Sequence, residues 1–316
     1  MSSTVTAEKP FKQFFSRLNL TAKAPGDTKW DIALGIIFIH AGALLAPFTF
    51  TWPAFWVFLV LQTMTGMVGI TLCYHRLLTH RSFAVPKWLE YFFSVCGVLA
   101  MQGGPLKWVA THRIHHAFSD RPQDPHSPNK GFWWAHMFWL FPYDEMLDDH
   151  KKSVRFVPDL VRDRVQVWLE RNQVLIALAL AVGLYAFGGL PFLIWGFFLR
   201  AAVVYHCTWL VNSAAHVWGY QSYTTNEGSR NNWWVAILTY GEGWHNNHHA
   251  YPTSAAHGLR WWEVDLTYLT IRMLAWMKLA SGIRLPQGGP AALPKFDPLA
   301  ASKKLRLAIL RPTPTL

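Results

Sequence analysis

The chain has 316 residues, of which 52% are hydrophobic and only 15% charged, with a net charge of +11 and 15 histidines. This composition excludes a disordered, collagen-like or small disulfide-stabilised protein. Cys73, Cys96 and Cys207 lack the paired spacing of a disulfide framework or a thiolate metal site, so any metal would be held by nitrogen or oxygen. The positive charge fits nucleic acid or an anionic lipid surface, and the apolar segments decide for lipid.

Four apolar segments approach the length of about 20 residues that a helix needs to cross a bilayer. They are predicted to form two antiparallel helical hairpins, closed at residues 49–53 and at Gly188, Gly189 and Pro191. The predicted spans are about 32–48, 54–74, 173–190 and 191–211. A fifth apolar run, 88–104, contains Glu90 and ends in Gly-Gly-Pro, so we expect an interfacial or buried helix there.

The lysines and arginines predict how the chain is oriented. Both hairpin turns lack them, whereas the polar pieces are rich in them, so the positive-inside rule places both termini in the cytoplasm. Residues 75–172 and 213–285 would then form a helical cap on that face. We expect a polar segment 1–30 without a signal peptide, one membrane domain 31–285, and a loosely ordered tail 286–316.

Three histidine clusters are the strongest chemical signal: His75-Arg-Leu-Leu-Thr-His80, His112-Arg-Ile-His115-His116 and His245-Asn-Asn-His248-His249. In an α-helix, the histidines of HxxHH lie within about 100° of one another and can face one centre. His75 and His80 lie about 140° apart on an α-helix, which suits two different ions, or one ion approached at a helix end. Eight imidazoles exceed the need of one ion and predict two metals, each with four or five ligands. Imidazole suits iron, zinc, copper and nickel alike.

The residues outside these clusters leave several roles open. His216 lies one helical turn after Asn212, at the cap end of the fourth predicted span, and fits a ninth ligand as well as a structural role. His40, inside the first span, is expected to be a packing histidine. Five histidines are expected to be structural, to support the ligands or to be exposed: His126, His136, His150, His206 and His257.

The order HxxxxH, HxxHH and HNNHH around two helical hairpins resembles the three histidine boxes of the integral-membrane fatty acyl desaturases. The resemblance extends from about residue 31 to 280. It is closest to the Δ9 branch in the stretches 69–82, 102–120 and 241–251, the last with GEGWHNNHH complete. These stretches look like the Δ9 acyl-lipid enzymes of cyanobacteria and plastids, and more distantly like animal stearoyl-CoA desaturases.

This resemblance implies an oxidoreductase that uses O2 and two electrons at a di-iron (Fe2+) centre to form a cis Δ9 double bond in a saturated C16 or C18 acyl chain. It implies that Asn212 reaches one iron through a water, and that Gln102, Trp108 and Thr208, with Trp209 beside them, line a bent substrate tunnel. Glu242 could orient one imidazole through its free N–H, or be a helix-capping or surface carboxylate. The implied iron ligands are His75, His80, His112, His115, His116, His216, His245, His248 and His249.

Two differences from related enzymes predict the acyl carrier and the electron donor: substituted residues near the second histidine box and a missing haem motif. Where the acyl-CoA enzymes have Asn, Arg and Asp near coenzyme A, this chain has Gly103, Ala110 and Thr111, which favours a glycerolipid substrate over acyl-CoA. The chain has no HPGG haem motif, so a separate protein would supply electrons. The resemblance favours ferredoxin, with cytochrome b5 as the alternative, and the basic cap would attract an acidic donor or instead hold anionic lipid. The expected location is a plasma or thylakoid membrane, with no nucleic-acid partner.

One alternative is another type of enzyme, and a second belongs to a different class of function. A histidine-box hydroxylase or ketolase would share the metal site but insert oxygen; the HNNHH box and the Gln102, Trp108 and Thr208 set are arguments against it. A histidine-rich metal transporter would hold ligands near the bilayer midplane, whereas these clusters lie at predicted membrane ends or in the cap.

Overall fold

The computed structural model describes residues 24–286, and over that range the predicted all-helical fold is confirmed, with isolated β-bridges but no strand. The predicted tail and most of the polar N-terminal segment lie outside the described residues. The elements in chain order are α2 (Trp30–Ala43), η1 (Ala46–Thr49), α3 (Trp52–Gln62), η2 (Thr63–Thr79), α4 (Lys87–Leu99), α5 (Pro105–Phe118), η3 (Pro128–Lys130), α6 (Phe132–His136), η4 (Phe138–Leu140), α7 (Glu145–Asp148), α8 (His150–Ser153), η5 (Val154–Phe156), η6 (Leu160–Arg162), α9 (Arg164–Leu193), η7 (Ile194–Leu199), α10 (Arg200–Asn212), α11 (Ala214–Val217), α12 (Trp233–Leu238), α13 (His245–Ala250) and α14 (Leu266–Trp276).

Two helical segments of the described chain are long and apolar enough to cross a membrane, Trp52–Thr79 and Arg164–Val217, while Trp30–Ala43 is apolar but shorter. The second segment bends at Gly189, whose φ of 62° favours glycine. A Cβ on Gly196 would lie 3.0 Å from the methyl groups of Leu184. Residues twelve apart in a straight helix would be about 18 Å apart, so the chain reverses at Gly189 and forms two arms.

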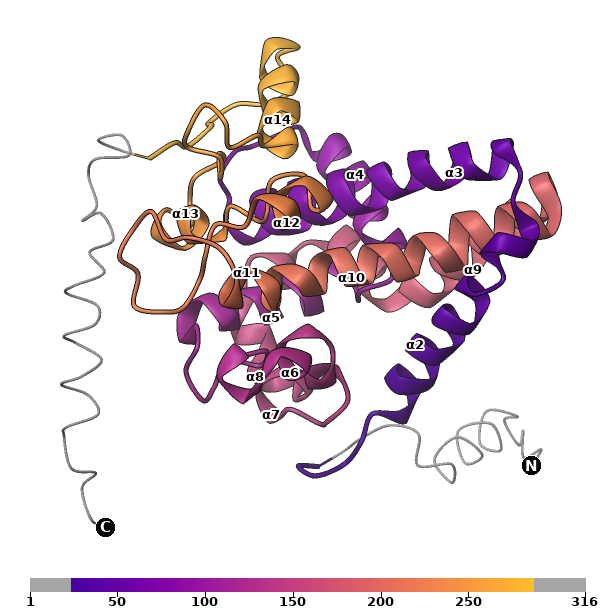
Figure 1. The fold of residues 1–316 in the computed structure, drawn as a ribbon, viewed down its shortest axis with the longest axis horizontal. Coiled ribbons are helices and arrows are strands. Elements are labelled where there is room, and N and C mark those ends of the chain that lie inside the picture. The colour runs from indigo at the N-terminus through magenta and orange to yellow at the C-terminus, as the bar shows by residue number, and fades with distance from the viewer. Residues whose placement is uncertain (1–23, 287–316) are drawn as a thin grey trace, which may run out of the picture.

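The predicted first hairpin is open rather than closely packed. A short connection joins α2 to α3, but the two helices diverge, and η7 packs against both of them (Figure 1). The close approach of α2 to η7 depends on Gly42, because a Cβ there would overlap the ring of Phe198. The short connection in the sequence predicts that the chain reverses between α2 and α3, but it does not predict that η7 packs into the angle between them.

The second predicted span continues beyond Tyr74. Helix α3 runs without a break into η2, a π-helix that ends at Thr79. The N–H of His80 donates to the carbonyl oxygen of His75 at 3.1 Å, a bond between residues five apart. In this π-type winding, residues five apart such as His75 and His80 lie on the same side of the helix. In an α-helix they would point in different directions.

The fifth apolar run forms α4, whose 13 residues are fewer than a crossing needs. It packs against η2 and α9. Arg200 is fully buried, and its guanidinium donates to the carbonyl oxygens of Gly196 and of Leu99, at the end of α4. The short helices of the cap gather at one end of the long ones, with α5, α11 and α13 close together (Figure 1).

Candidate metal centre

Five of the predicted ligands form one set, with ligand atoms within 4.8 Å of one another: His75, His80, His112, His116 and His248. The Nε2 atom of His248 lies 3.2 Å from that of His75 and 2.9 Å from that of His116, whose Nε2 lies 3.1 Å from that of His112. The π-helical end of η2 explains why His75 and His80 share this set. Of the two arrangements predicted for that pair, the structure has the one in which both face a single centre.

The other four predicted histidines form a second set: His115, His216, His245 and His249. The Nε2 atom of His245 lies 3.1 Å from those of His216 and His249, and the Nε2 atom of His115 lies 3.4 Å from that of His249. His216, which sequence left open, therefore lies among histidines of the second and third boxes. The HxxHH histidines do not all face one centre, because His115 belongs to the second set and its neighbours His112 and His116 to the first.

The spacing of these nitrogens fits metal ions. An ion about 2.1 Å from each of two nitrogens, at octahedral or tetrahedral angles, holds those nitrogens about 3.0–3.4 Å apart. The Nδ1 atom of His75 lies 2.7 Å from Glu242 Oε2, so the carboxylate favours the tautomer with its proton on Nδ1, in which the Nε2 lone pair faces the set. The buried Nε2 of His80 has no hydrogen-bond partner within the described structure. Both features suit a cation at the centre.

Carboxylates lie behind the imidazoles of the second set: Asp124 is fully buried, and Asp120 and Glu227 are half-buried. Asp124 Oδ2 lies 3.0 Å from Nδ1 of His115, Asp120 Oδ1 lies 3.4 Å from Nδ1 of His216, and Glu227 Oε1 lies 3.7 Å from Nδ1 of His249. Such partners fix the tautomer of a ligating histidine and raise its basicity. Sequence reasoning missed these carboxylates, although Asp120 and Asp124 follow the second box by four and eight residues.

Glu242 connects the first set to a buried ionic network. Its Oε1 accepts from the guanidinium of Arg76 at 3.0 and 3.1 Å, and Arg76 also donates to Asp265 at 2.9 Å. Burial alone would raise the pKa of Glu242, but the charge of Arg76 outweighs it and holds that pKa well below its usual value. Glu242 is thus an ionised, buried carboxylate in contact with His75, and a surface position is excluded.

The electrostatics of both sets favour neutral imidazoles. Burial, followed by repulsion from neighbouring imidazoles, holds the pKa values of His112, His116, His245 and His248 well below 6.5. A neutral imidazole keeps the lone pair that binds a metal. His115 differs because the charge of Asp124 outweighs burial and raises its pKa.

Two further histidines lie next to the sets. The ring of His257 lies 4.3 Å from that of His248, and its Nδ1 lies 3.0 Å from Glu242. The ring of His126 lies 4.4 Å from that of His115. Both are buried and belong to the group expected to be structural or to support ligands. The isolated position of each in the sequence gave no signal of this proximity.

Three other histidines form a separate string away from the sets. His206 bonds through Nε2 to His40 and through Nδ1 to His136, each at 3.0 Å, and His136 Nδ1 lies 3.0 Å from Ser213 Oγ. His40 therefore packs, as expected, but against another histidine. His150 is exposed on α8.

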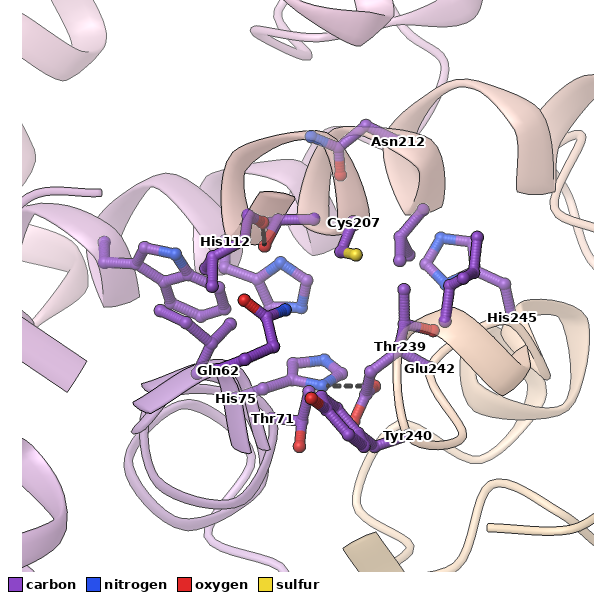
Figure 2. A pocket seen from close by; sticks show the side chains of 17 residues that line it. Gln62, Thr71, His75, His112, Cys207, Asn212, Thr239, Tyr240, Glu242 and His245 are labelled. Carbon is purple, nitrogen blue, oxygen red and sulfur yellow. Dashed lines mark hydrogen bonds and ion pairs between the residues drawn. The ribbon is translucent and has the colours of Figure 1, made fainter. Parts of the chain in front are cut away.

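Two cavities meet beside the first set. Trp108, His112, Thr208 and Asn212 line both of them. The larger, of about 680 Å³, lies toward α2 and α9; the smaller, of about 50 Å³, lies among η2, α10 and α12. Figure 2 shows the smaller cavity with His75, His112, His245 and Asn212 around it, and a dashed line from His75 to Glu242.

The predicted tunnel residues are hydrogen-bonded to one another at this junction. Gln102 Nε2 donates to Thr208 Oγ1 at 2.8 Å and to the carbonyl oxygen of Val204 at 3.2 Å, and Trp108 Nε1 donates to Gln102 Oε1 at 3.3 Å. The indole of Trp108 stacks on His112, with ring centroids 5.3 Å apart. Trp209 is buried and lines the larger cavity. These side chains can therefore fix the shape of a substrate next to the first histidine set.

Comparison with known proteins adds an independent finding. Residues 50–275 match the sequence profile of the fatty acid desaturase family. An sn-1 stearoyl-lipid 9-desaturase of Synechocystis sp. is 49% identical over 286 residues, covering 87% of this chain and 88% of that protein. An enzyme of the same name from Anabaena variabilis is 51% identical over 258 residues, covering 81% and 94%. An acyl-CoA 5-desaturase of Anemone leveillei is 48% identical over 248 residues, covering 78% and 77%.

Proposed function

Because the chain belongs to the fatty acid desaturase family, we propose that it is an oxidoreductase that introduces a cis double bond at carbon 9 of a saturated acyl chain carried by a membrane glycerolipid. The observation that carries this proposal is the placement of two histidine sets beside a hydrogen-bonded Gln102, Trp108 and Thr208 group at the junction of two cavities. The two 9-desaturases from cyanobacteria support the position of the double bond and the lipid carrier.

In this proposal the nine histidines hold two iron ions, five in the first set and four in the second. Asn212, which lines both cavities, would complete the second site through a water. When bound, the iron pair would supply the activation of O2 with two external electrons. Glu242, Asp120, Asp124 and Glu227 would keep the imidazole lone pairs directed at the metals.

The protein's own contribution to the reaction is positioning. The saturated chain would lie in the larger cavity, bend at Gln102 and Thr208, and place its tail in the smaller cavity between η2 and α10. The hydrogen bonds among Gln102, Trp108 and Thr208 leave few rotamers at the bend, so the same carbons face the histidine sets at each turnover. A cis double bond follows because the chain is already bent at the reacting carbons.

The acyl carrier needs its own argument, because the relative from Anemone carries an acyl-CoA name at nearly the same identity as the two lipid enzymes. Gly103 and Thr111, which replace polar or charged residues of the acyl-CoA pattern, both line the larger cavity. Neither brings a positive charge to meet the phosphates of coenzyme A. This composition supports the glycerolipid.

We extend the proposal to topology and electron supply. One membrane domain, 31–285, would cross the bilayer four times, with α2, α3 continuing into η2, and the two arms that meet at Gly189. Both termini and the histidine sets would face the cytoplasm. The electron donor would be ferredoxin, attracted by the excess of positive charge over the whole chain.

The experiment that tests this function is expression with ferredoxin and its reductase in a cell that lacks O2-dependent desaturases. Double bonds are mapped by gas chromatography and mass spectrometry, separately in glycerolipids and in acyl-CoA. A cis Δ9 bond that appears first in intact glycerolipid is expected. Its first appearance in acyl-CoA overturns the carrier, and a hydroxylated chain overturns desaturation in favour of the hydroxylase branch.

A further inference from the structure

The larger cavity opens between two apolar helices. Ile32, Gly35, Ile36 and Ile39 line it from one face of α2, at the spacing of successive helical turns. Val174, Ala177 and Leu178 line it from the facing side of α9, again at helical spacing. Figure 1 shows α2 leaning away from the α9 and α10 arms at its N-terminal end. The cavity therefore has walls that belong to the apolar helices, where acyl chains of a bilayer would lie.

Gly35 marks an open position in this wall. A Cβ added to Gly35 would meet no heavy atom within 4 Å. By contrast, Gly42, two turns further along the same helix, is covered by Phe198. The gap between α2 and α9 is thus empty of side chains at Gly35, while α2 is anchored further along at Gly42.

The polar end of the cavity is balanced in charge. Lys29 and Lys107 line it together with Asp31 and Asp148. Asp148 lies 3.0 Å from Lys29 Nζ and 2.6 Å from Lys107 Nζ, so one carboxylate pairs with both ammonium groups. This rim presents hydrogen-bonding groups without net charge. It suits an uncharged or zwitterionic headgroup and does not suit a ligand with several phosphates.

The inner end of the same cavity reaches the chemistry. His112, a member of the first histidine set, lines it together with Asn212, Trp108 and Thr208. One continuous space therefore connects a charge-balanced rim, an apolar opening between two helices and the bend residues. An acyl chain that enters between the helices can reach the histidines while its headgroup stays at the rim.

We propose that the opening between α2 and α9 is a lateral portal through which one acyl chain of a bilayer glycerolipid enters, with the Lys29, Asp148 and Lys107 rim holding its uncharged or zwitterionic headgroup. This inference rests on the proposed function and names the route and the substrate class. Acyl-CoA, a soluble substrate, would not need an opening toward the bilayer.

The test blocks the portal from either wall. Gly35→Trp fills the gap from α2, where an added Cβ meets no heavy atom within 4 Å, and Leu178→Trp fills it from α9. The matched controls are Ile37→Trp on α2 and Leu175→Trp on α9, because both residues are exposed and neither lines the cavity. Each variant is reconstituted as the full chain in vesicles of monogalactosyldiacylglycerol and phosphatidylglycerol, and its thermal unfolding is compared with that of the parent.

Two readouts are taken from the same vesicles. The first is photocrosslinking to a galactolipid probe with a diazirine in its saturated sn-1 chain, with the attachment sites found by mass spectrometry. The second is the desaturation of the vesicle lipid with ferredoxin, reductase and O2. We expect both portal variants to lose crosslinks near Trp108 and to lose desaturation by about tenfold or more, with the controls within about twofold of the parent.

The outcomes separate this inference from the function on which it rests. Crosslinks at α2, α9 and Trp108 in a parent that forms no double bond would support the portal and overturn the proposed function. A parent that desaturates the lipid, with stably folded Gly35→Trp and Leu178→Trp variants as active as their controls, would overturn the portal alone. Equal loss in portal variants and controls would also overturn it.

Discussion

His248 links two other members of the first histidine set, because its Nε2 faces both His75 and His116. Replacing it with alanine removes one of the five imidazoles of the first set. We expect His248→Ala to lose one of two bound iron ions and at least about a hundredfold in desaturation, while the helical content stays unchanged. Iron is measured by plasma mass spectrometry and helical content by circular dichroism. His150→Ala, at an exposed position outside both sets, is the control; equal loss there would remove the distinction between ligand and structural histidines.

His136 gives a prediction for pH. Burial, with repulsion from His206, lowers the pKa of His136 to about 4, against an ordinary value of 6.5. Between these pH values the unfolded chain binds a proton at His136 and the folded chain does not, so this contribution to stability is complete above about pH 6.5 and is lost as the pH falls toward 4. We expect His136→Gln to have a shallower decrease of melting temperature over this range in detergent. The exposed His150→Gln variant should keep the parental slope; a parental slope in His136→Gln would contradict the assignment.

The spacing of the histidines predicted that two metals would be needed, because eight imidazoles are too many for one. It could not predict how the histidines divide between the sets. That division depends on the π-helical end of η2 and on the position of His216 after α10, which are tertiary features. The supporting carboxylates could not be found from spacing alone either, since Glu227 and Glu242 reach the histidines through loops and folding.

At the scale of helices, Gly69 determines how closely η2 approaches α4. A Cβ at Gly69 would lie 2.5 Å from backbone atoms of Cys96 and Gly97, which cannot rotate away as a side chain can. We therefore expect Gly69→Ala to destabilise the protein by about 1–3 kcal/mol through overpacking. The matched change Gly183→Ala, on α9 with nothing within 4 Å, should stabilise by up to about 1 kcal/mol through helix propensity. Unfolding followed by circular dichroism in detergent measures both, and a harmless Gly69→Ala would contradict the close packing.

Gly66, one turn earlier on η2, lines the smaller cavity proposed to hold the acyl tail. A Cβ there would lie 3.3 Å from the Tyr240 ring, so a larger side chain extends into the cavity with a small adjustment. We expect Gly66→Leu to shift the product from C18 toward C16 by about tenfold in ratio, because the longer tail no longer fits. Gas chromatography of the total lipid measures the ratio. The exposed Val60→Leu, outside this cavity, should leave the ratio unchanged; an unchanged ratio in Gly66→Leu would place the tail elsewhere.

The apolar segments of the sequence were sufficient to predict where the long helices lie, since every predicted span is helical in the structure. Helix ends were less predictable. The helix of the second span continues past Tyr74 to Thr79 because the cap covers its last turns, where burial replaces hydrophobicity as the stabilising factor. The open angle between α2 and α3 depends on Gly42 and Phe198, two residues far apart in the sequence, and no local pattern encodes their contact.

At the scale of the whole molecule, a site built from three boxes requires all three to lie on one side of the bilayer. In the proposed topology the first two boxes follow the second predicted span and the third box follows the fourth, so an even number of crossings would separate the third box from the other two. The connection between α2 and α3 and the bend at Gly189 would then lie together on the opposite side. Phe50 and Phe187, next to these two turns, are 47% and 91% exposed, and Trp261 in the cap is 91% exposed.

We therefore expect Phe50→Cys and Phe187→Cys to react with a membrane-impermeant maleimide from outside intact spheroplasts, and Trp261→Cys and Lys130→Cys to react only after lysis. The native Cys73 and Cys96 are buried and Cys207 is half-buried, so the parent chain is labelled in parallel to give the background. If the segment Arg164–Val217 crossed the membrane only once and Phe187 lay outside, Trp261 would lie outside as well. Labelling of Phe187→Cys from outside together with labelling of Trp261→Cys only after lysis therefore requires two crossings in this segment. Labelling of Phe187→Cys only after lysis would contradict this topology. Only the first pair of predicted spans would then cross the membrane, and the histidine sets would have to form without a second pair of membrane-spanning helices.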